Sequence, residues 1–265
     1  MLQRLRSYSE LTLYLLGQSV LRAMEYRAAF LFQVLGMFIN NLCWLGCWYL
    51  FFLNFPEVNG WRFKDSALLL GFSCVSAGVM IAFFWGSFEL SRTIYRGELD
   101  YYLGFPKNVL WHLSVSSGRM SGLGDILSGV LLCALAAEIT LSGILLFFYL
   151  VLLSTLALYS FTIITRSFSF FVGNFESAAD ELFWSIITFG IYPSSAFHGV
   201  LKLLICTVVP AFFVFVLPVE LLRDFSWYKL VLLTAVVIVM FASALAVFGS
   251  GLRRYESGSL IQTKV

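Results

Sequence analysis

The densest group of residues that could do chemistry lies in the middle of the chain, at Arg96-Gly97-Glu98-Leu99-Asp100. Arg92 precedes this group, and Tyr101 and Pro106 follow it. A guanidinium and a carboxylate four residues apart share a helix face, so we expect Arg96 to pair with Asp100. Charges of both signs beside tyrosines, with a proline to end the helix, favour a surface that docks a soluble partner. A solvated loop explains the spacing equally well.

Enzymatic chemistry has little support in the sequence. A Walker A loop ends in Gly-Lys followed by Ser or Thr, and the chain contains no Gly-Lys pair, so it does not hold ATP phosphates in that way. The zinc motif H-E-x-x-H and the nucleophile motif G-x-S-x-G are absent, and the two histidines, His112 and His198, lie far apart. The formal net charge is only +2, and the basic residues form no run that would suggest nucleic acid. We therefore expect a protein that is not an enzyme and binds no metal, cofactor or nucleic acid itself.

Four polar residues stand inside apolar stretches: Asn40, Asn41, Arg119 and Asp125. Such groups are costly in lipid unless they pair or face water, so they are candidates for a transport pathway or for contacts between helices. Arg119 and Asp125 are six residues apart and fall on different helix faces, so we do not expect them to pair with each other. For Arg119, a contact with a neighbouring helix or the membrane interface is the simpler interpretation, and a substrate contact is the alternative.

The composition decides which elements must position these residues. Hydrophobic residues make up 60% of the 265 residues and charged residues only 12%. Soluble domains carry about 45–50% and about 25% respectively. The excess apolar surface cannot be hidden in a soluble core of this length, so the chain is predicted to be an all-α membrane protein.

Six membrane-spanning helices are predicted from the apolar stretches. The fifth is interrupted, because its two apolar pieces, 182–197 and 203–218, are each short for a full crossing. We interpret them as one broken span followed by a re-entrant hairpin over about 198–220, which must be covered by protein or line a wet cavity. In the third span, Gly118 and Gly122 form a G-x-x-x-G pattern, which permits close helix contact. The predicted spans are 28–53, 66–89, 109–137, 141–165, the broken span from 182, and 229–250.

The first 27 residues have a different pattern from the spans. Apolar residues recur there at helical spacing with charged residues between them, which predicts an amphipathic helix lying on the membrane surface. A frayed polar leader is the alternative. The apolar residues of this pattern are Leu2, Leu5, Tyr8, Leu11 and Leu15.

The distribution of positive charge predicts that both termini are cytoplasmic. With six crossings, eleven Lys and Arg residues fall inside and five outside, while Arg119 lies within a span, which accounts for all 17. The chain contains no Asn-x-Ser/Thr sequon and its first apolar run is too long for a signal peptide, which fits a bacterial inner membrane. The five outer residues are Arg62, Lys64, Lys202, Arg223 and Lys229.

Three pieces of the sequence, taken in order, resemble the permease proteins of the ABC-2 transporter family. They are Glu25-Tyr26-Arg27-Ala28-Ala29-Phe30 at the entry to the first span, the central group from Arg96 through Leu103, Pro106 and Leu110 to Gly124-Asp125, and the tail Gly251–Ser259. None is diagnostic alone, but the resemblance extends over nearly the whole chain. One departure is that Tyr101, Tyr102 and Phe105 make the central group more aromatic than expected.

The resemblance implies a role and a set of partners. Such permeases have no ATPase of their own and work as two permeases, identical or related, with two P-loop nucleotide-binding subunits that hold ATP and Mg²⁺. Residues 91–108 would then be the coupling segment that docks the ATPase, residues 1–27 the interface helix, and 251–265 a cytoplasmic tail. Family substrates are usually exported and include drugs, lipids and peptides.

Two other classes of function stay open on the sequence alone. A membrane scaffold or assembly factor would show no nucleotide-dependent change. An ion-coupled carrier should have internal repeats and paired ionisable groups near the middle of the membrane. We find no convincing repeat, and most ionisable residues lie at the predicted span boundaries.

Overall fold

The computed structural model describes residues 2–136, 140–193, 197, 199–200, 204 and 207–256, with side chains from residue 8 onward. In these ranges the chain forms helices and no β-strand, apart from one isolated bridge between Val58 and Trp61. The all-α prediction is therefore confirmed. The last nine residues of the expected cytoplasmic tail lie outside the described residues.

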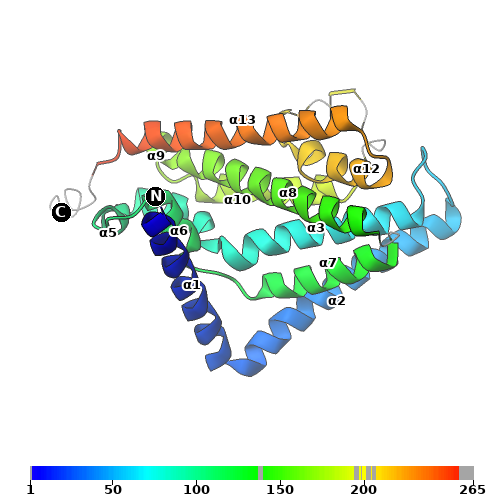
Figure 1. The fold of residues 1–265 in the computed structure, drawn as a ribbon, viewed down its shortest axis with the longest axis horizontal. Helices are drawn as coiled ribbons and strands as arrows, with labels where there is room; N and C mark the ends of the chain where they lie inside the picture. The colour runs from blue at the N-terminus through cyan, green and yellow to red at the C-terminus, as the bar shows by residue number, and fades with distance from the viewer. Residues whose placement is uncertain are drawn as a thin grey trace.

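Five long helices form an elongated bundle in which they lie roughly side by side (Figure 1). Four helical stretches in the described ranges are long and apolar enough to cross a membrane. They are α2, α3, the stretch Leu141–Val172 that contains α8, and α13. The fifth, α7, is apolar but shorter. The bounds are α2 Arg27–Asn54, α3 Phe63–Phe83, α7 Ser121–Ala136, α8 Leu141–Ser167 and α13 Trp227–Leu252.

The helix α3 is the centre of the bundle, because most of its residues are buried while α2 and α13 are largely exposed. It packs closely against α7 through two pairs of glycines. A Cβ atom on Gly122 would lie 2.6 Å from the Gly78 carbonyl oxygen, and one on Gly129 would lie 2.5 Å from the Gly71 carbonyl oxygen. The close helix contact predicted at Gly122 is thus confirmed and continues seven residues further along both helices, whereas Gly118 of the same pattern lies before α7 begins.

Two of the predicted spans are shorter than expected. The helix α3 ends at Phe83 rather than near residue 89, and the expected third span is divided into two helices, with an interruption at residues 116–120. Glycines explain both interruptions, because they let backbone segments cross at close range. A Cβ on Gly86 would lie 1.9 Å from the Leu113 carbonyl oxygen, and one on Gly118 would lie 2.2 Å from the Ala82 carbonyl oxygen.

Short helices replace the lost turns at one end of the bundle. They are η1 Trp85–Glu89, α4 Leu90–Tyr95, α5 Leu99–Leu103 and α6 Val109–Val115. The start of α1 and the end of α13 also lie at this end (Figure 1).

The first helix, α1 Leu2–Glu25, lies at an angle to the bundle and meets α2 at a sharp bend (Figure 1). Its inner side is tied to the segment around α6. The backbone N–H of Asn108 donates to the Tyr8 hydroxyl at 2.9 Å, and the Trp111 indole N–H donates to the Thr12 hydroxyl at 3.1 Å. Its outer side exposes large apolar side chains, among them Leu13 and Leu21.

The chain between α8 and α13 contains α9 Ser169–Val172, α10 Glu176–Gly190, the π-helix η3 Phe212–Val216 and α12 Leu217–Arg223. The first limb of the expected re-entrant hairpin, from residue 198, falls largely outside the described residues. Residues 210–220 are mostly buried and contact α8, where the Ser154 hydroxyl donates to the Val214 carbonyl oxygen at 2.5 Å, and the hairpin itself stays a prediction.

Candidate functional site

Residues 91–108, which we call the coupling segment after their expected role, have a buried apolar side and an exposed polar side. The side chain of Leu99 is fully buried and fixes α5 on the bundle. The expected docking residues Arg96, Glu98, Asp100 and Pro106 are exposed on the other side. The segment therefore presents a charged outer surface on an apolar base.

The predicted pairing of Arg96 with Asp100 is wrong, because the two residues do not share a helix. Gly97 has a φ of +74° and separates α4 from α5. Among the described residues no ion pair joins Arg96 to Asp100, and the Arg96 guanidinium lies 5.9 Å from the centroid of the Tyr95 ring. Asp100 instead lies near Tyr255, three residues after α13 ends, and burial together with the Asp100 charge raises the pKa of the Tyr255 phenol.

Aromatic rings lie exposed on the same surface. Tyr101 is 65% exposed and Phe105 is 41% exposed, and their ring centroids are 5.1 Å apart. Tyr102 turns inward and packs against His112, and burial raises the pKa of the Tyr102 phenol. Exposed aromatic residues at a polar end of a membrane protein are typical of a protein-binding surface.

Arg92 connects the coupling segment to α10. Its Nη2 lies 2.7 Å from Oε1 of Glu176, and its Nε donates to Oε2 of the same carboxylate at 3.4 Å. The hydrogen bond to Glu176 and the charge of this carboxylate raise the pKa of the Arg92 guanidinium above its ordinary value. A bidentate pair fixes orientation as well as distance, so α4 and α10 are held in a defined register.

A second ion pair holds α10 one turn further along. Arg166, at the end of α8, is only 1% exposed and pairs with Asp180. Glu176 and Asp180 are four residues apart, so both anchors lie on one face of α10. The helix α10 is thus fixed to the coupling segment and to α8 by the same face.

Arg166 also takes part in a stack of cations and aromatic rings. Its guanidinium lies 5.1 Å from the centroid of the Phe88 ring, and Phe88 stacks on Trp85 with centroids 4.5 Å apart. The Arg119 guanidinium lies 3.8 Å from the centroid of the Trp85 ring. Arg119 therefore contacts η1, through the Trp85 ring.

The other predicted polar residues differ in burial. Asn41 is buried, and its amide donates to Oδ1 of Asp125 and to the Ser128 hydroxyl, each at 2.8 Å. Asn40 is exposed on α2. The Asn41–Asp125–Ser128 contact joins α2 to α7 and satisfies polar groups that would otherwise be costly in lipid.

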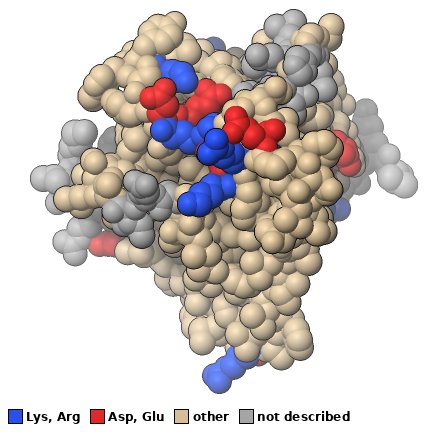
Figure 2. Space-filling view, turned by 90° about the vertical axis from the view of Figure 1, so that its right-hand side faces the viewer, with Lys and Arg blue, Asp and Glu red and all other residues tan. Residues whose placement is uncertain are grey.

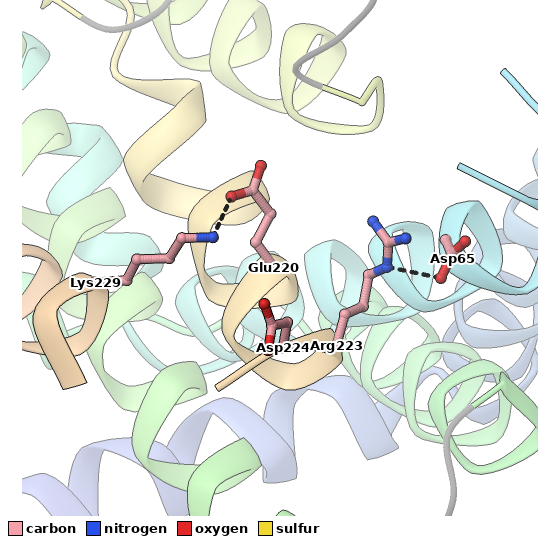
Figure 3. Close-up of a pocket in the computed structure, with 5 residues that line it drawn as sticks. All are labelled: Asp65, Glu220, Arg223, Asp224 and Lys229. Atoms are coloured by element: carbon pink, nitrogen blue, oxygen red, sulfur yellow. Dashed lines mark hydrogen bonds and ion pairs between the residues drawn. The ribbon is translucent and has the colours of Figure 1, made fainter. Parts of the chain in front are cut away.

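A charged pocket lies at the end of the bundle opposite the coupling segment. Figure 2 shows acidic and basic side chains gathered on this face. The pocket has a volume of about 460 Å³. Arg223 pairs with Asp65 at 2.8 Å, and Lys229 pairs with Glu220 at 3.3 Å (Figure 3). These pairs fasten α12 to the beginnings of α3 and α13.

A second, apolar pocket of about 340 Å³ opens between α6, α8 and α13. Its walls are mainly aromatic and aliphatic, with few polar groups, so it suits a hydrophobic group rather than an ion. Its lining includes Phe84, Trp111, Tyr159, Phe241 and Leu245.

The sequence did not point to the ion pairs of α10. Glu176 and Asp180 carried no pairing prediction, because their partners lie 84 and 14 residues earlier in the sequence. The charged pocket was missed in the same way, although the close spacing of Glu220, Arg223 and Asp224 could have indicated it.

A family model described as an ABC-2 family transporter protein matches residues 38–259. The matched range begins within α2 and includes the coupling segment, both anchors of α10 and the charged pocket. The comparisons with curated proteins and with solved structures found no match.

Proposed function

Because the chain belongs to the ABC-2 family of transporter proteins, we propose that it is a permease that exports a hydrophobic or amphiphilic molecule and is driven by a separate ATPase. Membership of this family and the long apolar helices make it an integral membrane protein and the permease of an ABC transporter. The partner, the substrate class and the direction of transport are the proposed part.

The observation that carries the proposal is the outer surface of the coupling segment. It combines exposed charges at Arg96, Glu98 and Asp100 with the exposed rings of Tyr101 and Phe105. Aromatic and charged residues on a rigid base suit a protein partner, and the sequence offers no Walker A loop of its own. The partner would be a P-loop ATPase that holds ATP and Mg²⁺.

We place the membrane so that this end of the bundle is cytoplasmic, in a bacterial inner membrane. Both termini then lie on the cytoplasmic side, as the charge count predicts. The helices α7 and α10 are each short for a full crossing. Together with α2, α3, α8 and α13 they would give the six expected crossings. A second permease, identical or related, would complete the transporter.

The apolar pocket between α6, α8 and α13 supports the proposed substrate class. It lies beside Phe84 and Trp111, directly behind the coupling segment. A movement of the coupling segment would therefore reach the walls of this pocket. A drug, lipid or peptide with a hydrophobic group would fit its lining.

The test is to purify the permease from its native membrane in mild detergent and to measure the amount of P-loop ATPase that accompanies it. The double charge reversal Arg96→Glu with Glu98→Arg should remove the ATPase. A matched control reverses Arg62 and Glu57, an exposed ion pair at the other end of the bundle, and should keep the ATPase. If no ATPase accompanies the unaltered permease in several detergents, the proposal fails.

A further inference from the structure

A polar pocket of about 620 Å³ lies where α1 and α2 approach the link between α6 and α7. This pocket is separate from both the coupling surface and the apolar pocket. None of the residues that line it is acidic. They are Ser19, Arg22 and Ala23 of α1, Gln33 of α2, and residues 117–121 of the link and the start of α7.

Two guanidinium groups give the pocket its charge. In the described part of the chain, no ion pair joins a carboxylate to Arg22 or Arg119. Trp85 supports the guanidinium of Arg119, which orients its N–H groups. The positive end of the 16-residue helix α7 begins at Ser121, in the pocket wall. Glu89 lies close enough to interact with both arginines but does not line the pocket.

Neutral donors lie beside the two arginines. The hydroxyl of Ser117 is buried and has no hydrogen-bond partner in the part of the chain that the structure describes. Gln33 and Ser121 add an amide and a hydroxyl. Guanidinium groups bind phosphate through paired N–H donors, and hydroxyl groups complete such sites. The donor set therefore fits a phosphate better than a cation or an apolar group.

The surroundings of the pocket are apolar and exposed. Next to Gln33, the α2 side chains Leu31, Phe32 and Leu35 are exposed, and Phe32 is 76% exposed. On α1, Val20 and Met24 flank the lining residues and are also exposed. A molecule with a phosphate in the pocket would have hydrocarbon-binding surface directly beside it.

We propose that this pocket binds the phosphate of an anionic membrane phospholipid, with Arg22 and Arg119 on the phosphate and the acyl chains along α2. The lipid would fasten α1 to the bundle at the link before α7. The site lies away from the docking surface, so it can be present even if the ATPase proposal fails.

The test measures thermal unfolding of the purified full-length permease in a neutral detergent. Short-chain phosphatidylglycerol should raise the unfolding temperature, and the matching uncharged diacylglycerol should not. The double variant carries Arg22→Gln and Arg119→Gln and loses two charge-assisted contacts. The concentration of phosphatidylglycerol that gives half of the full rise in unfolding temperature should increase about tenfold or more in this variant. Glycerol phosphate carries the phosphate without the acyl chains, so it distinguishes binding of a lipid from binding of a free phosphate. It should not raise the unfolding temperature at the same concentration.

Arg27→Gln is the matched control, because Arg27 is exposed at the same bend but does not line the pocket. It should respond to phosphatidylglycerol like the unaltered protein. Ser117→Ala is the milder variant if the double variant does not fold, and it should weaken the response severalfold. The proposal is overturned if the folded pocket variants respond normally, if Arg27→Gln weakens the response equally, or if glycerol phosphate stabilises the protein as well as the lipid does.

Discussion

The Arg119 guanidinium lies 3.8 Å from the centroid of the Trp85 ring, although the two residues are separated by the whole coupling segment. Trp85 stacks on Phe88, and the buried guanidinium of Arg166 lies over the ring of Phe88. Two positive charges near the membrane are thus covered by aromatic rings rather than by carboxylates alone. The link before α7, the turn after α3 and the end of α8 are joined through this stack.

Replacement of Trp85 by Leu should lower the free energy of unfolding by about 1–3 kcal/mol, because a cation–π contact and a ring stack are lost. Titration with a denaturing detergent measures this change. Trp184→Leu is the control, since Trp184 is half exposed on α10. Equal losses in both variants would show that the stack adds nothing specific.

Replacement of Asp180 by Asn should destabilise the protein by about 1.5–3 kcal/mol, because the buried guanidinium of Arg166 loses its ionic partner. The neighbouring variant Glu181→Gln changes an exposed carboxylate by the same chemistry. It should change the stability by less than about 0.5 kcal/mol. A loss of similar size in the two variants would argue against the Arg166–Asp180 pair as an anchor.

The Arg92–Glu176 pair can be measured with a double-mutant cycle. Its coupling energy should be favourable but small, because water screens the half-exposed Arg92 side chain. The charge reversals Arg92→Glu and Glu176→Arg should each reduce ATP-dependent transport, and the two together should restore part of it. Failure of the double reversal to recover any transport would place the role of Arg92 outside this pair.

Replacement of Gly122 by Ala should cost about 1–3 kcal/mol, because the new Cβ would meet the Gly78 backbone at 2.6 Å. Gly46→Ala is the control, since a Cβ there meets nothing within 4 Å. It should be neutral or slightly stabilising, because Ala favours the helix over Gly. Detergent-induced unfolding of the two variants compares them directly.

Binding of phosphatidylglycerol should strengthen as the pH falls from neutral. Burial raises the pKa of Glu89, although the charges of Arg92, Arg119 and Arg22 oppose this and Glu176 adds to it. Above this raised pKa the carboxylate offsets part of the arginine charge, and below it the offset is lost while the phosphodiester stays ionised. The Glu89→Gln variant should bind phosphatidylglycerol equally well at neutral and at acidic pH. If its affinity still changed with pH, Glu89 would be excluded as the cause of the pH dependence.

The all-α class and the main helices were predictable, because long apolar runs have few alternatives in lipid. The interruptions at Gly86 and Gly118 were not predictable. At both positions the chain leaves its helix because of a backbone contact with a segment distant in the sequence, and hydropathy carries no information about such contacts. The number of crossings stays a prediction for α7 and α10.

The candidate site was predictable in position but not in its contacts. The composition of residues 91–108 indicated an exposed polar segment, and the structure places Arg96, Glu98 and Asp100 on its surface. The pairing of Arg96 with Asp100 failed because helical spacing assumes an unbroken helix, and Gly97 breaks it. The roles of Arg92 and Arg119 depend on Glu176 and Trp85, which only the folded chain brings close.

The two ion pairs on one face of α10 limit which segments can be exchanged between this permease and a related one. A coupling segment transplanted from a related permease would bring its own residue at position 92 but would meet the Glu176 of this chain. Without a basic residue at that position, a chimera would leave the segment attached to α10 by apolar packing alone. Exchange of docking specificity between permeases should therefore move the first turns of α10 together with the coupling segment, as one inherited unit.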